Sequence, residues 1–280
     1  MIGPEPYQKM NGTGSVGQNN SGQIICVRTV QCSAIRNLFE TLKDVLQDCN
    51  LVFDQRGVKC LQMDNNNNII VSVKLNAASF EEYYCKERFV AGINVGNMFR
   101  LIKGIGQSDT LILSVSENNT NILQMRIDNF DKNMKSTFEL NLLDIDEVVL
   151  EIPDTTFDVV LTMPSLDLQR ICRDLSILSE TIEVVSADKK LVLKADGDFA
   201  KQSVEMGEKE NGLYFANTNT ENRDVICGRY SLKYLNLFSK ANVLCSTVDM
   251  YLKNDFPMIL SYTVASLGRL LFCIATKVDP

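Results

Sequence analysis

Four segments of this sequence combine two basic side chains with an apolar stripe at helical spacing. Residues three or four positions apart share one face of a helix, so in each segment the cations fall opposite the stripe. The pairs are Arg36 and Lys43, Arg100 and Lys103, Arg170 and Arg173, and Lys233 and Lys240. Two cations on one amphipathic helix are usually a solvated face, but the fourfold repetition favours a binding surface. Such a surface suits the repeated, identical phosphates of a nucleic-acid backbone.

The helices that must position these residues are predicted at 33–47, 95–103, 163–179 and 231–240. In the third of them, Leu168, Ile171 and Leu175 form the stripe, and Ser165 stands where a hydroxyl can bond the first turn. Asn94 is the expected cap of the second. The basic faces have no aromatic residues that could stack on unpaired bases, which favours duplex over single-stranded nucleic acid.

Between the helices, short runs of alternating apolar and polar residues, separated by Asn, Asp and Gly, predict β-strands. The runs fall at 24–30, 50–54, 57–64, 69–75 and 89–93, three between 109 and 142, then 157–163, 181–195, beyond 199, 224–229, 246–252, 258–264 and 269–275. The segments 92–115 and 228–251 align throughout, with an offset of 136 positions, and Ser33 and Ser165 are 132 apart. The chain is therefore predicted to be an internal duplication of a β-rich unit with two helices.

The predicted fold class is α+β, with two duplicated domains that each place two helices on curved antiparallel sheets. We expect domains at 23–140 and 157–280, joined by an extended acidic linker at 141–156. Residues 1–22, rich in Gly, Asn, Ser and Gln, are expected to be a disordered tail. If both domains lay their helices on one side of a continuous sheet, the eight cations form a single basic surface.

Composition argues against several classes of function. The chain has no histidine, which removes Ser-His-Asp and Cys-His nucleophile systems, HExxH zinc sites and the usual imidazole base. Its nine cysteines form no CxxC pair and are expected to be reduced and buried, so we expect neither a metal nor a cofactor. The net charge is −7, and no apolar run is long enough to cross a bilayer, so no membrane partner is expected. A hydrolase that uses Asp or Cys groups is the weakest alternative, because no activating base stands out.

Several motifs resemble one family closely. They are FETLKDVL, GVKCLQMD, LQRICRDLS, LLDIDEVVLEIP, KYLNLFSKA and the ending IATKVD, and the resemblance extends over residues 24–279. The family is that of the eukaryotic DNA sliding clamp, proliferating cell nuclear antigen. The resemblance implies a DNA clamp fold that closes as a homotrimeric ring with pseudo-sixfold symmetry around duplex DNA, the helices lining the hole. The eight cations match the family's inner basic positions, whereas Asn37 stands where a further basic residue is common.

The resemblance also implies two protein-binding sites. Partners such as DNA polymerase, ligase and nuclease would insert a short peptide beneath the linker, and a clamp loader ATPase would place the ring on DNA. The matching positions are Met63, Asn67, Asn68, Ile70, Leu150, Ile152, Pro257, Ile274 and Ala275. Met63 and Ile70 could equally be core residues. Subunits would join edge to edge, the strand around Phe138 pairing with that around Phe199 to Val204 of the next chain, which protects two sheet edges.

The sequence is also compatible with two other functions. Within the family, the chain could be a checkpoint-type clamp subunit that assembles as a heterotrimer. In another class, it could be an adaptor that binds peptides without encircling DNA. The resemblance implies a protein of the nucleus, or of a viral replication site in the cytoplasm. Asn67 and Asn68 replace larger or apolar residues usual in the family, and Asp188 stands where a modified lysine occurs, with Lys189 beside it.

Overall fold

The computed structural model of the protein describes residues 22–64, 68–147, 155–218 and 225–277. The first half of the chain contains β1 (Gln23–Thr29), α1 (Cys32–Leu42), β2 (Asp48–Asp54), β3 (Gly57–Met63), β4 (Ile69–Asn76), β5 (Glu82–Cys85), β6 (Phe89–Asn94), α2 (Val95–Ile102), β7 (Asp109–Ser116), β8 (Asn119–Asn129) and β9 (Met134–Asn141). A short 3-10 turn, η1 (Ala77–Ser79), lies between β4 and β5.

The second half repeats this order. It contains β10 (Val159–Pro164), α3 (Ser165–Leu175), β11 (Thr181–Ala187), β12 (Lys190–Asp196), β13 (Lys201–Gly207), β14 (Tyr214–Thr218), β15 (Ile226–Ser231), α4 (Leu232–Ser239), the 3-10 turn η2 (Lys240–Val243), β16 (Thr247–Leu252), β17 (Met258–Val264) and β18 (Gly268–Ile274). In each half a helix follows the first and the sixth strand, so the predicted duplication is confirmed for the described elements. The offset between equivalent helices of the two halves is one residue larger than predicted. The helix α1 begins at residue 32 and its equivalent α3 at 165, and α2 begins at 95 and its equivalent α4 at 232.

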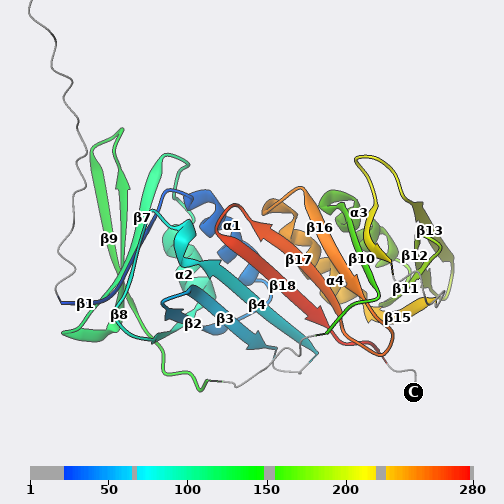
Figure 1. Cartoon of the computed structure of the whole chain (residues 1–280), viewed down its shortest axis with the longest axis horizontal. Coiled ribbons are helices and arrows are strands. Elements are labelled where there is room, and N and C mark those ends of the chain that lie inside the picture. The colour runs from blue at the N-terminus through cyan, green and yellow to red at the C-terminus, as the bar shows by residue number, and fades with distance from the viewer. Residues whose placement is uncertain (1–21, 65–67, 148–154, 219–224, 278–280) are drawn as a thin grey trace, which may run out of the picture.

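The strands of the two halves also pair alike. The described strands form a five-stranded sheet in the order β5-β1-β7-β8-β9, a nine-stranded sheet in the order β14-β10-β16-β17-β18-β4-β3-β2-β6, and a four-stranded sheet in the order β13-β12-β11-β15. All pairings are antiparallel, and adding nine to each strand number of the first half gives those of the second. Among the described strands, only the pairing of β4 with β18 joins one half to the other, from Ile69 opposite Ile274 to Leu75 opposite Gly268. The central sheet is therefore continuous across both halves, as Figure 1 shows.

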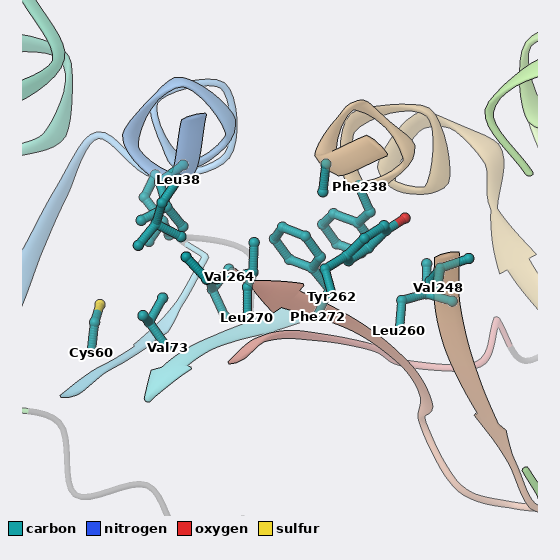
Figure 2. Close-up of a cluster of buried hydrophobic side chains, with 14 of the residues drawn as sticks. Leu38, Cys60, Val73, Phe238, Val248, Leu260, Tyr262, Val264, Leu270 and Phe272 are labelled. Carbon is teal, nitrogen blue, oxygen red and sulfur yellow. The ribbon is translucent and has the colours of Figure 1, made fainter. Parts of the chain in front are cut away.

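The core lies between this sheet and the helices. Figure 2 shows α1 and α4 on one face of the central sheet, with Leu38 and Phe238 directed toward the side chains of Leu270, Phe272 and Tyr262. The rings of Phe238 and Phe272 stack with centroids 4.2 Å apart. Because successive residues of a strand point to opposite faces, the residues between these core positions face outward, away from the helices.

The predicted helices are confirmed, with shorter bounds. The Asn94 side chain caps α2 as expected, since its Oδ1 accepts a hydrogen bond from the Asn97 amide at 2.9 Å. Ser165 does not cap α3; its hydroxyl instead donates to the Cys245 carbonyl at 2.8 Å, which fixes the helix start to the loop before β16. The strands β5 and β14 were not predicted, because neither short segment has a sustained apolar alternation.

Candidate nucleic-acid interface and partner surface

All eight predicted phosphate-binding residues lie on α1 to α4 or directly after these helices. Figure 1 shows the four helices in a row along the long axis of the molecule. Two hydrogen bonds join them through η2: Asn37 donates to the Val243 carbonyl at 2.9 Å, and Asn242 donates to Gln169 at 3.0 Å. Asn37, which stands where a basic residue is common in similar sequences, thus connects α1 to the second half. The helices of both halves form one layer, as the single basic surface requires.

Six of the eight cations are exposed, and Arg36 and Lys43 are half-buried. Arg36 donates to the Ile105 carbonyl at 3.1 Å, so this residue also ties α1 to the loop that follows α2. Arg170 and Arg173 contact Asp167 and Asp174 of their own helix at 3.2 and 3.7 Å. Such exposed pairs contribute little, so these two arginines remain available to a polyanion.

Asp44 neutralises part of the basic surface. Its carboxylate accepts hydrogen bonds from Lys43 at 2.9 Å and from Lys240 at 2.8 Å. The bond from Lys240 is the main reason that the pKa of Asp44 lies below its ordinary value. Two of the eight predicted cations are therefore engaged by one carboxylate, a contact between the halves that spacing along the chain could not reveal.

Two aromatic rings lie beside lysines of this surface, contrary to the expectation that its faces lack aromatic residues. Lys43 Nζ is 5.2 Å from the centroid of Phe99, and Lys233 Nζ is 5.9 Å from that of Tyr234. Both rings are half-buried, and Tyr234 stacks on the buried Phe238. They support the lysine stems rather than presenting a free face for a base.

The structure brings together the described members of the predicted peptide site. Met63 of β3 lies opposite Ile70 of β4, which lies opposite Cys273 of β18. Met63 and Ile70 are half-buried and do not belong to the core, so the alternative that they are core residues is wrong. Pro257 is exposed and directly precedes β17, whose first residue pairs with the end of β18.

Not every predicted member offers its side chain. Ile274 is only 1% exposed and packs in the core, because it lies on the inward face of β18. Ala275 is exposed, and its amide donates to the Asn68 carbonyl at 3.1 Å, which joins the C-terminal segment to the β3–β4 connection. Asn67, Leu150 and Ile152 lie outside the described residues.

A hydrogen-bonded cluster links this surface to the helix layer. Asp64 Oδ1 accepts from the amides of Asn68 at 2.7 Å and Ile69 at 3.0 Å. Its Oδ2 accepts from the Tyr234 hydroxyl at 3.0 Å. Tyr234 belongs to α4, so a residue of the basic helix layer holds the connection that carries Asn68. No local pattern indicates this contact, because the two residues are 170 positions apart along the chain.

The linker and the C-terminal segment occupy equivalent places in the two halves. The Leu143 amide donates to the Gly92 carbonyl at 2.8 Å, and the Lys277 amide donates to the Arg229 carbonyl at 2.7 Å. A Cβ at position 92 would lie 2.2 Å from the Leu143 carbonyl oxygen, so only glycine allows this close approach. Arg88 forms an ion pair with Glu147, which holds the described end of the linker.

The predicted subunit-interface residues lie on or beside two edge strands. Phe138 is on β9 and Val204 is on β13, and both are half-buried. Phe199, just before β13, is 74% exposed. Each strand ends its sheet among the described residues, and Figure 1 places β9 and β13 at opposite ends of the molecule.

Wherever the pKa of a cysteine thiol is shifted, it is raised, which disfavours the reactive thiolate. Six of the nine cysteines are buried, whereas Cys85, Cys227 and Cys245 are not, so the expectation of burial holds only in part. Burial raises the pKa of the Cys32 thiol to about 11 and that of Cys172 to about 12, which keeps both protonated. Over the described part of the chain, no three or more Cys, Asp or Glu residues are placed to hold a metal, and no helix is long and apolar enough to span a membrane.

The duplicated α+β units, joined through one continuous sheet and carrying their helices in a single layer, define a DNA clamp fold. The chain belongs to the proliferating cell nuclear antigen family. Residues 24–149 match the N-terminal domain of proliferating cell nuclear antigen, and residues 151–277 match its C-terminal domain.

Two relatives illustrate the relationship. The chain is 36% identical over 253 residues to the "Probable DNA polymerase sliding clamp 1" of Paramecium bursaria Chlorella virus 1, covering 89% of this chain and 95% of the relative. It is 29% identical over 253 residues to the "Proliferating cell nuclear antigen" of Chaetomium thermophilum, covering 90% and 97%.

Proposed function

We propose that this chain is a DNA sliding clamp and polymerase processivity factor, and that three copies close head to tail into a ring around duplex DNA. The observation that carries the proposal is the relationship between the two edge strands. Within the chain, β18 pairs with β4. The duplication makes β9 of the first half the counterpart of β18, and β13 of the second half the counterpart of β4, and both counterparts are edge strands. A head-to-tail contact of this kind closes into a ring when its rotation allows.

The duplication predicts the register of that contact. Asn94 and Ser231 directly precede α2 and α4 and therefore occupy equivalent positions in the two halves. When the strand pairings are followed outward from these two residues, Lys74 of β4 corresponds to Glu205 of β13. Ile112 of β7 and Asp249 of β16 lie equally far along the chain from Asn94 and Ser231, and the strand pairings that start from these two residues make Arg269 of β18 correspond to Lys135 of β9. Since Lys74 lies opposite Arg269, Lys135 lies opposite Glu205 of the next copy.

This register matches the side chains on both faces of the junction. On the outer face, Lys135 meets Glu205 and Glu139 meets Lys201, two pairs of opposite charge. On the inner face, Phe138 lies diagonal to Val204 of the next copy, so both half-buried side chains gain cover. The proposed domains at 23–140 and 157–280, joined by the linker at 141–156, would thus provide six domain copies around a ring of three chains.

The ring explains how an acidic chain holds DNA. Each copy turns its helix layer inward, so phosphates meet the exposed lysines and arginines while the acidic surplus stays outside. Contacts with phosphate alone are independent of sequence and weak enough to allow sliding. The closed circle, rather than affinity, provides the long residence on DNA.

The partner surface gives the clamp its role in replication. Met63, Ile70 and Pro257 offer apolar contacts to short peptides of a DNA polymerase, and ligases and nucleases would compete for the same surface. A clamp loader ATPase would open and close the ring, while the clamp itself performs no catalysis. It would work where DNA is replicated, in the nucleus or at a viral replication site.

The test combines native mass with retention on DNA. The protein alone should have the mass of three chains, and after loading it should stay on a closed circular duplex and leave when the circle is cut. A monomer that needs different chains to assemble would indicate a heterotrimeric clamp instead. A trimer that is never retained on the circle, although it binds peptides, would indicate an adaptor and overturn the proposal.

A further inference from the structure

The surface has several open hollows, the volumes of which reach about 820 Å³. One of them, with a volume of about 570 Å³, lies on the outer face of the central sheet and is called the outer hollow below. One end of this outer hollow is lined by Phe157, Tyr251, Ile259 and Leu271, and the other by Lys74 and Arg269. It adjoins the predicted partner surface, because Leu271 and Cys273 are alternate residues of β18 and face the same side.

The apolar end of the outer hollow is already formed. Phe157 packs edge-on against Tyr251 with ring centroids 5.5 Å apart and planes at 67°. Lys253 donates to the Thr156 carbonyl at 3.1 Å, which fixes the segment that carries Phe157. Both rings are half-buried, so they can accept a further apolar side chain without rearrangement.

The other end carries an unusual pair of charges. Lys74 and Arg269 lie directly opposite each other across β4 and β18, and both are exposed. Lys59, next in the same row, forms an ion pair with Asp54 at 2.6 Å, whereas neither Lys74 nor Arg269 has an acidic partner among the described residues. Like charges directly opposite in a sheet destabilise it, so folding alone does not favour this pair.

The proposed subunit junction makes the contrast sharper. Its corresponding residues are Lys135 and Glu205, a pair of opposite charge. The two junctions share one architecture, yet the one within the chain keeps two cations in an acidic protein. An anionic ligand that bridges both cations would account for the difference.

We propose that the outer hollow binds an acidic peptide segment of a partner protein. Carboxylates lie between Lys74 and Arg269, and a neighbouring apolar side chain packs against Phe157 and Tyr251. A peptide fits better than DNA because one end of the hollow is apolar and the hollow faces away from the helix layer. The inference rests on the proposed function only in that it extends the partner surface, and it can be measured without DNA.

The experiment uses a fluorescein-labelled probe, a twelve-residue peptide with one central Phe flanked by Glu, and follows its anisotropy on the full chain. The variant Lys74→Glu with Arg269→Glu should lose about tenfold in affinity, since two exposed ion pairs are replaced by repulsion. The control, Lys132→Glu with Lys209→Glu, makes the same change of net charge at two exposed turn residues and should change affinity less than about twofold. A probe with Lys in place of Glu should bind the native chain more weakly than the acidic probe.

A second measurement does not depend on the probe. Lys74→Glu alone places opposite charges on β4 and β18, so it should raise the thermal unfolding midpoint while weakening the acidic probe. Equal loss in the control variant, or equal binding of acidic and basic probes, would overturn the proposal. A larger loss of duplex DNA than of peptide in the double variant would assign the hollow to nucleic acid instead. Ring mass and retention on circular DNA should be unchanged in this variant, so failure here is separate from failure of the clamp function.

Discussion

The Asp44 carboxylate accepts a hydrogen bond from Lys240 Nζ at 2.8 Å, and this contact joins the end of α1 to the end of α4. Asp44 also accepts from Lys43 at 2.9 Å, so one acid lies between two cations of the helix layer. The contact both stabilises the junction between the halves and lowers the positive charge that faces DNA. These two effects have opposite consequences for stability and for binding, and they can be separated.

Replacing Asp44 by Asn should strengthen DNA binding. It removes one negative charge and releases Lys43 and Lys240, so duplex affinity should rise about three- to tenfold at low salt, with a steeper salt dependence. Fluorescence anisotropy of a short duplex over a salt series measures both. Glu40→Gln is the matched control, because Glu40 is exposed on the same helix and its loss removes the same charge without freeing a lysine. Equal gains in both variants would show that Asp44 acts only through net charge.

The same carboxylate should make stability depend on pH. The pKa of Asp44 is lowered in the folded chain, chiefly by Lys240, so its contribution is present above the unfolded value of about 4 and is lost as pH falls through the folded value. Native protein should therefore be more stable than Asp44→Asn at pH 7, and the difference should shrink as pH falls below about 4 and vanish once pH lies below the folded pKa. Urea unfolding of both proteins over this range measures the difference. A gap that persists in acid would assign the effect to packing.

Exposed cations of the helix layer should support processivity. Replacing Lys103, Arg170, Arg173 and Lys233 by Ala should lower polymerase stimulation on long templates several-fold, because phosphate contacts that centre the duplex are lost. Native mass should remain that of the trimer, since these side chains are exposed and, within the described part of the chain, form no ion pair between the halves. Arg36 is less suitable for this test, because it also bonds the Ile105 carbonyl. Undiminished stimulation in the fourfold variant would refute the role of these residues.

Charge reversal should test the register of the ring. Glu139→Lys alone places two cations together at the junction with Lys201 of the next copy, so it should shift the trimer toward monomer. Adding Lys201→Glu restores opposite charges and should restore the trimer. Sedimentation at several concentrations measures both variants. If the double variant is no better than the single one, the register is wrong even where the ring itself exists.

The Tyr234 hydroxyl should matter for peptide binding but not for DNA. Tyr234→Phe removes its bond to Asp64 and should weaken a partner peptide about two- to fivefold, because the connection that carries Asn68 loses one of its supports. Calorimetry with a polymerase-derived peptide gives the affinity. Tyr214→Phe, at an exposed tyrosine of β14, is the control and should be neutral. Equal DNA affinity in all three proteins would show that the effect is local.

The sequence by itself determined the duplication, the four amphipathic helices and the cations opposite their apolar stripes. These features follow from local spacing, since a period of 3.6 or of 2 residues is visible along the chain. The tertiary structure alone decided what depends on contacts between distant residues: the pairing of β4 with β18, the bond between Asp44 and Lys240, the inward side chain of Ile274, and the two cations of Lys74 and Arg269 placed face to face. Register and burial are set by partners far along the chain, so no local pattern specifies them.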